Sequence, residues 1–139
     1  RSRDARLAGC AAVGREALFR EADGVTLHVD MRPGNEHLGG PPLLSLMKPT
    51  AILINASRGE VLDTAALAAA IRAKTIAGAA IDVYDPEPPG AEFPLLGFDN
   101  VLLTPHMAAR TSTAVDNMCW VVRDIVEVVS GRPPKYPAP

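Results

Sequence analysis

Four short apolar segments, each of strand length, alternate with helical patterns along this chain. They cover residues 24–29, 51–55, 79–83 and 100–104. Their near-continuous apolar character is typical of strands that are covered on both faces. Alternation of such strands with helices indicates βαβ units with right-handed crossovers. The sequence therefore predicts a doubly wound α/β fold around a mostly parallel sheet.

Three helices are expected between and after these segments. The first covers residues 15–22, and the second covers residues 65–73 with Asp63 or Thr64 as its N-cap. The third begins at Thr113 and ends before Gly131. An apolar stripe at helical spacing marks this last helix: Val115, Met118, Val122, Ile125 and Val129.

The composition of the chain excludes several classes of protein. A chain of 139 residues, 47% of them apolar, is long enough for one buried core. Sixteen acidic against fourteen basic residues give no positive field for nucleic acid or an anionic membrane. No transmembrane or signal segment is predicted. Cys10 and Cys119 lack a partner histidine or a Cys-x-x-Cys spacing, so we predict a reducing, cytoplasmic setting and no metal site.

Polar residues follow three successive apolar segments, where the carboxyl ends of parallel strands meet. These residues are Arg58, Asp82, Glu87 and His106. Arginine binds a carboxylate through two hydrogen bonds, and histidine exchanges a proton near neutral pH. Taken singly, each is more often a solvated charge, but their coincidence at one edge predicts an acid–base site for an anionic substrate.

Residues 47–59, 78–88 and 100–106 closely resemble the D-isomer-specific 2-hydroxyacid dehydrogenases, with three motifs in the family's order and at its spacing. The resemblance covers essentially the whole chain. It implies a Rossmann-like NAD(P)-binding domain. It also implies an oxidoreductase that interconverts a 2-oxo acid and a D-2-hydroxy acid by hydride transfer with NAD or NADP.

The resemblance also implies a role for each site residue. Arg58 would bind the substrate carboxylate and polarise the carbonyl, His106 would exchange the proton at the C2 oxygen, and Glu87 would pair with His106. Asp82 would lie beside the nicotinamide. Further contacts to the cofactor would come from Ala56, Ser57, Arg58, His106, Ala108 and Ala109.

The sequence departs from the family pattern at its beginning. Residue 1 is Arg, and no two glycines are separated by a single residue, so the Gly-x-Gly-x-x-Gly phosphate loop is missing. We therefore expect residues 1–139 to be the second half of the dinucleotide-binding domain with a C-terminal helix and tail. The glycine loop and the substrate domain are absent, and this part alone should be inactive.

Several alternatives stay open at this point. Arg1, Ser2 and Arg3 stand near the position that binds the cofactor ribose, where arginine favours NADP and an acidic residue favours NAD. The chain could instead belong to a non-catalytic, cofactor-sensing binding protein or be an inactive remnant. The family's domains usually dimerise, so a homodimer is expected, and the particular 2-oxo or 2-hydroxy acid is open.

Overall fold

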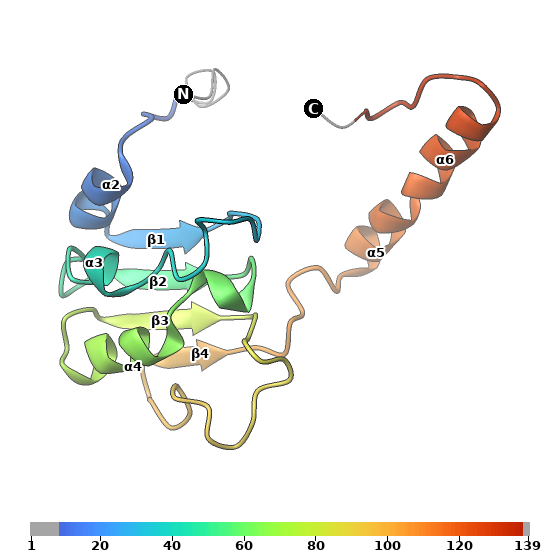
Figure 1. Cartoon of the computed structure of the whole chain (residues 1–139). Coiled ribbons are helices and arrows are strands. Elements are labelled where there is room, and N and C mark those ends of the chain that lie inside the picture. The colour runs from blue at the N-terminus through green and yellow to red at the C-terminus, as the bar shows by residue number, and fades with distance from the viewer. Residues whose placement is uncertain (1–8, 138–139) are drawn as a thin grey trace. The chain divides into compact units, whose positions relative to one another are not determined.

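A parallel four-stranded sheet forms the centre of the fold in the computed structural model, which describes residues 9–137. The strands are β1 (Gly24–Leu27), β2 (Ile52–Asn55), β3 (Gly78–Ile81) and β4 (Val101–Leu103), and they lie in that order across the sheet (Figure 1). The prediction of a mostly parallel α/β sheet is confirmed. Each strand is one or two residues shorter than its apolar segment.

The register of the sheet brings the carboxyl ends of the strands together. Leu27 pairs with Asn55, Asn55 with Ile81, and Ile81 with Leu103. Two further backbone bonds extend this alignment past the strand ends, from Asp82 N–H to Asn55 O and from Thr104 N–H to Ile81 O. The loops that follow β2, β3 and β4 therefore leave the sheet side by side.

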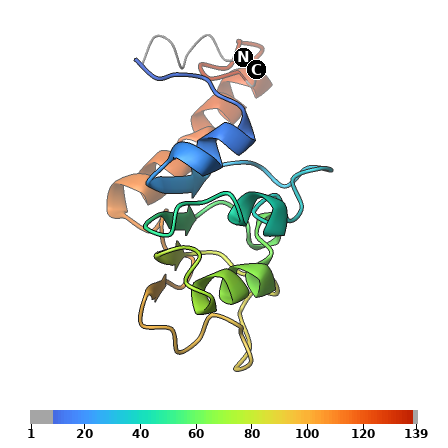
Figure 2. The same cartoon turned by 90° about the vertical axis from the view of Figure 1, so that its left-hand side faces the viewer.

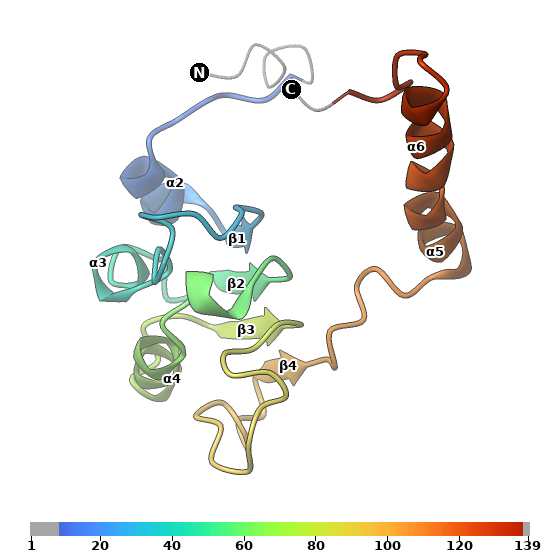
Figure 3. The ribbon, with the colours of Figure 1, turned by 45° about the vertical axis from the view of Figure 1, so that its right-hand side comes forward.

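Helices α2 (Arg15–Glu21), α3 (Pro41–Leu44) and α4 (Thr64–Arg72) pack on the same face of this sheet (Figures 2 and 3). The Asp63 side chain accepts a bond from Ala66 N–H at 2.9 Å. Of the two predicted candidates, Asp63 is therefore the N-cap of α4. The short helix α3 was not predicted, because its Pro-Pro start is equally typical of a turn.

Burial alternates along the first two strands. Val25, Leu27 and Leu53 are buried under the helices, whereas Ile52 and Ile54 on the other face are 47% and 40% exposed. The prediction that both faces are covered is therefore wrong for the described residues. Apolar residues continue on the uncovered face, so the sequence pattern alone cannot tell the two faces apart.

The chain divides into two compact units, with the boundary between His106 and Met107. The second unit holds α5 (Ser112–Cys119) and α6 (Val121–Val129). The predicted single helix is thus two helices that meet at Trp120, and the predicted cap at Thr113 is wrong. Thr111 is the N-cap, because its extended backbone lets its hydroxyl accept a bond from Ala114 N–H at 3.1 Å.

Within the described part of the second unit, the predicted apolar stripe is exposed along its length. Cys10 and Cys119 are both exposed, and neither forms a disulfide within the described residues. Among residues 9–137, no helix combines the length and apolar character needed to cross a membrane. Arg1, Ser2 and Arg3, which were predicted to approach the cofactor ribose, lie outside the described residues.

Candidate active site

The turn after β2 is organised by a buried asparagine. Asn55 is fully buried, and its side-chain oxygen accepts bonds from Ser57 N–H at 3.1 Å and from Ser57 Oγ at 2.9 Å. Its side-chain NH2 donates to Arg58 O at 2.9 Å. All of these bonds lie within four consecutive residues, so Asn55 fixes the backbone that carries Ser57 and Arg58 at the sheet edge.

Arg58 is exposed at the end of this turn, and its guanidinium donates to Ser57 O at 2.6 Å. The next residue, Gly59, packs against the loop that follows β3. A methyl group at Gly59 would lie only 2.0 Å from Tyr84 O, so only glycine fits there. This close approach ties the position of Arg58 to the loop that carries Glu87.

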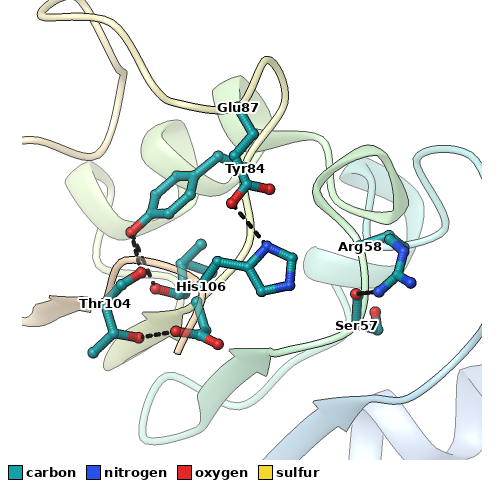
Figure 4. A network of polar contacts seen from close by, with 8 residues as sticks. Ser57, Arg58, Tyr84, Glu87, Thr104 and His106 are labelled. Atoms are coloured by element: carbon teal, nitrogen blue, oxygen red, sulfur yellow. Dashed lines mark hydrogen bonds and ion pairs between the residues drawn. The ribbon is translucent and has the colours of Figure 1, made fainter. Parts of the chain in front are cut away.

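Beyond β3, a polar network links that loop to the end of β4 (Figure 4). Asp82 is only 7% exposed and accepts a bond from Thr104 Oγ1 at 2.6 Å. The Tyr84 hydroxyl donates to Thr104 O at 2.7 Å. Burial, followed by the charges of Asp82 and Glu87, raises the pKa of Tyr84 above its usual value of 10.0, which keeps the hydroxyl protonated.

His106 and Glu87 form an ion pair at the mouth of this network. Glu87 Oε1 lies 2.7 Å from His106 Nδ1, and both side chains are partly exposed. Nδ1 is thus bonded to a carboxylate, which fixes the orientation of the ring. In Figure 4 the other ring nitrogen, Nε2, points towards the side on which Ser57 and Arg58 lie. An imidazole ring and a guanidinium group thus border the same edge of the sheet.

A cavity of about 360 Å³ opens between the ends of β1 and β2. It is lined by residues 28–31 and by Ala56, Ser57 and Arg58, three of the residues predicted to contact the cofactor. A cavity of this size has room for part of a dinucleotide, and the carboxyl ends of parallel strands are where such ligands bind. The residues present therefore fit one portion of NAD or NADP.

The structure brings most of the predicted site together within the first unit: Ala56, Ser57, Arg58, Asp82, Glu87 and His106. Ala108 and Ala109 belong to the second unit, so their contact with the cofactor stays a prediction. Among the described residues, no group of three or more His, Cys, Asp or Glu side chains is placed to bind a metal ion.

Asn55, Gly59 and Tyr84 are structurally important residues that the sequence analysis missed. Asn55 carried a signal, because it is a polar residue in phase with the buried Leu53 on an apolar strand. Gly59 and Tyr84 carried none, since their contact joins residues 25 positions apart in sequence. Only the fold shows that the two meet.

The fold and this edge define the class of the protein: a parallel nucleotide-binding α/β domain with an Arg, Glu and His set at its carboxyl edge. The family profile described as "D-isomer specific 2-hydroxyacid dehydrogenase, NAD binding domain" matches residues 1–108. The chain belongs to this family, which confirms the resemblance and the Rossmann-like fold.

Named relatives agree with this membership. D-3-phosphoglycerate dehydrogenase of Synechocystis is 44% identical over 126 residues, 90% of this chain and 23% of the relative. Glyoxylate reductase of Aeropyrum pernix is 40% identical over 120 residues, 86% of this chain and 36% of the relative.

A solved structure agrees as well. The D-isomer-specific 2-hydroxyacid dehydrogenase of Lactobacillus delbrueckii, in its NAD-complexed form, is 34% identical with a TM-score of 0.77. The match covers 86% of this chain and 40% of that chain. This chain thus spans between 23% and 40% of the length of these relatives.

Proposed function

We propose that the protein carrying this chain interconverts a 2-oxo acid and a D-2-hydroxy acid by hydride transfer with NAD or NADP. The observation that carries the proposal is the His106–Glu87 pair, 2.7 Å apart, at the same sheet edge as Arg58. Membership of the dehydrogenase family supports it. When bound, the nicotinamide cofactor supplies or accepts the hydride at C2.

Arg58 is proposed to bind the substrate carboxylate and polarise the C2 carbonyl. Its guanidinium is exposed and donates one bond, from Nη1, to Ser57 O. The remaining N–H groups of the fork can bind a carboxylate through two bonds. Asn55 and Gly59 fix the turn that contains the backbone of Arg58. The side chain that carries the guanidinium therefore extends from a fixed backbone position.

His106 is proposed to give a proton to the C2 oxygen during reduction and to take it back during oxidation. The Glu87 carboxylate accepts a bond from Nδ1–H and stabilises the charged ring, which leaves Nε2 to exchange the proton. Proton transfer to the C2 oxygen balances hydride transfer to the C2 carbon, because a carbonyl becomes a hydroxyl by gaining one hydride and one proton.

The cofactor is proposed to lie over the ends of β1, β2 and β3. Ala56 and Ser57 line the cavity there, and Asp82 would approach the nicotinamide. Ala108 and Ala109 are also proposed to contact the cofactor, as the family resemblance implies. The choice between NAD and NADP depends on residues near Arg1–Arg3, so both cofactors belong in the test.

We also propose a substrate class, an oligomeric state and a cellular location for the protein. We propose a small 2-oxo or 2-hydroxy acid as substrate, without nucleic acid or membrane as a partner. A homodimer is proposed because the apolar stripe of α5 and α6 is exposed. We propose a cytoplasmic location because the two cysteines form no disulfide within the described residues.

The test is oxidation of NADH and NADPH by the full-length protein with glyoxylate, hydroxypyruvate, pyruvate and phosphohydroxypyruvate, followed by chiral analysis of the products of the last three, because reduction of glyoxylate gives achiral glycolate. We expect turnover with at least one of these acids and the D isomer wherever the product is chiral. Cofactor binding without turnover of any acid would favour the cofactor-sensing alternative. Neither binding nor turnover would favour an inactive remnant.

A further inference from the structure

Thr104 is the junction of the polar network beneath His106. Its carbonyl oxygen accepts two hydrogen bonds, one from Tyr84 OH at 2.7 Å and one from His106 N–H at 3.0 Å. Its side-chain hydroxyl donates to Asp82 at 2.6 Å. Figure 4 shows Tyr84, Thr104 and His106 close together at the end of β4. A single residue thus connects Tyr84, Asp82 and His106.

His106 has a backbone conformation that side chains other than glycine rarely adopt. Its φ is +48°, in the left-handed region, and its N–H closes a tight turn onto Thr104 O across Pro105. Such a conformation is unfavourable for a residue other than glycine, so it persists only where surrounding contacts hold it. The turn aims the ring at Glu87, whose carboxylate lies 2.7 Å from Nδ1.

Tyr84 supplies one of those contacts from a rigid position. Its side chain is only 7% exposed, and its ring meets Phe93 edge to face with 5.2 Å between ring centroids. The hydroxyl therefore approaches Thr104 O from a fixed direction. Because the pKa of Tyr84 is raised, the hydroxyl remains a donor through the physiological range of pH.

We propose that Tyr84 is a positioning residue for His106: its buried hydroxyl holds the Thr104 carbonyl, which in turn holds the strained backbone turn that presents the His106 ring. This inference rests on the proposed function for its catalytic consequence. Tyr84 itself needs no contact with substrate or cofactor, since it acts through the Thr104 backbone.

The first test is Tyr84→Phe in the full-length protein. Phenylalanine keeps the ring packing against Phe93 and removes only the hydroxyl, so the fold is preserved. A small displacement of a catalytic group has large effects on rate. We expect kcat to fall about tenfold while KM for the 2-oxo acid changes less than about twofold. Tyr136→Phe, at an exposed tyrosine, is the matched control and should leave both constants unchanged.

A double-variant comparison shows whether Tyr84 acts through His106. If it does, adding Tyr84→Phe to a His106→Gln protein should lower kcat no further. Wild-type kcat in the single variant would overturn the proposal. A full additional tenfold loss in the His106→Gln background would overturn it as well, because the two residues would then act independently.

Hydrogen exchange at the His106 amide gives a readout that does not depend on activity. We expect this amide to exchange at least about fivefold faster in Tyr84→Phe than in the wild type or Tyr136→Phe. Unchanged exchange overturns the positioning role. Faster exchange in a protein that reduces no 2-oxo acid supports the positioning role while the proposed function fails, so the two failures are distinguishable.

Discussion

His106 Nδ1 lies 2.7 Å from Glu87 Oε1, a contact between two loops whose residues are 19 positions apart in sequence. The contact exists because β3 and β4 are adjacent and in register, so their loops leave the sheet together. It fixes the orientation of the His106 ring. The chemistry proposed for the protein depends on this pair.

Replacing Glu87 by Gln should lower kcat without unfolding the protein. Gln keeps the size of the side chain but removes the negative charge that stabilises the charged ring of His106. We expect a loss of at least about tenfold, and a larger loss, about 10²–10⁴-fold, for His106→Gln. Steady-state kinetics measure both, with Glu92→Gln, an exposed residue of the same loop, as control. Equal rates for the Glu87 and Glu92 variants would contradict the role of Glu87.

Gly59→Ala should damage the site through packing. A methyl group there would lie 2.0 Å from Tyr84 O, and its three nearest neighbours are backbone atoms of Tyr84 and Asp85, which cannot move aside as a flexible side chain would. We expect a destabilisation of at least about 1–3 kcal/mol together with a loss of 2-oxo acid binding at Arg58. Gly90→Ala is the control, since nothing lies within 4 Å of its added methyl group. Thermal unfolding of both variants is the measurement, and equal midpoints would contradict the predicted clash.

The cap of α4 gives a third prediction. Asp63→Ala removes the acceptor of Ala66 N–H, which should lower the opening free energy of the first turn of α4 by about 1 kcal/mol. Asp63→Asn retains an acceptor and should stay near the wild type. Amide exchange across residues 64–67 checks this, and an Ala variant that exchanges like the Asn variant would show that the cap contributes nothing.

How much of this could be predicted from sequence depends on the separation of the residues concerned. The sheet, the Asp63 cap and the clustering of Arg58, Asp82 and Glu87 follow from local patterns and from the rule that parallel strands end together. The Thr111 cap was missed because three consecutive residues at the start of the helix, Thr111, Ser112 and Thr113, are all residue types that can cap it.

The Gly59–Tyr84 contact and the Tyr84–Thr104 bond could not be predicted in this way. Each joins residues 20 or more positions apart, and the register of the sheet decides which backbone atoms meet. Neither residue type signals such a contact locally, since a glycine after a strand is typical of any turn. The residues that hold the site in place are thus harder to predict from the sequence than the site residues themselves.

The Asp30–Arg32 pair predicts a defined pH dependence. The Arg32 guanidinium binds both oxygens of the Asp30 carboxylate, at 2.7 and 2.5 Å, and this lowers the pKa of Asp30 below its ordinary value of 3.8. A carboxyl group whose pKa is lower in the folded state stabilises the fold above its unfolded pKa. That contribution is lost as the pH falls through the folded pKa, so it is complete at neutral pH.

Carboxyl NMR titration of Asp30 measures this effect directly. In the wild type the midpoint should lie below 3.8, and in Arg32→Ala it should rise towards that value. Asn35 also donates to Asp30 Oδ1, at 3.3 Å, so the rise should be incomplete. A midpoint that is the same in both proteins would show that the ion pair does not form in solution.

Following the hydride from the cofactor to the product tests the proposed reduction of a 2-oxo acid most directly. The full-length protein is given cofactor carrying deuterium at the transferred position, together with the 2-oxo acid that it reduces fastest, and the product is analysed by mass spectrometry and chiral separation. We expect one deuterium at C2 of a D-2-hydroxy acid. The His106→Gln variant should form this product far more slowly. A product without deuterium at C2, or with the L configuration, would contradict it.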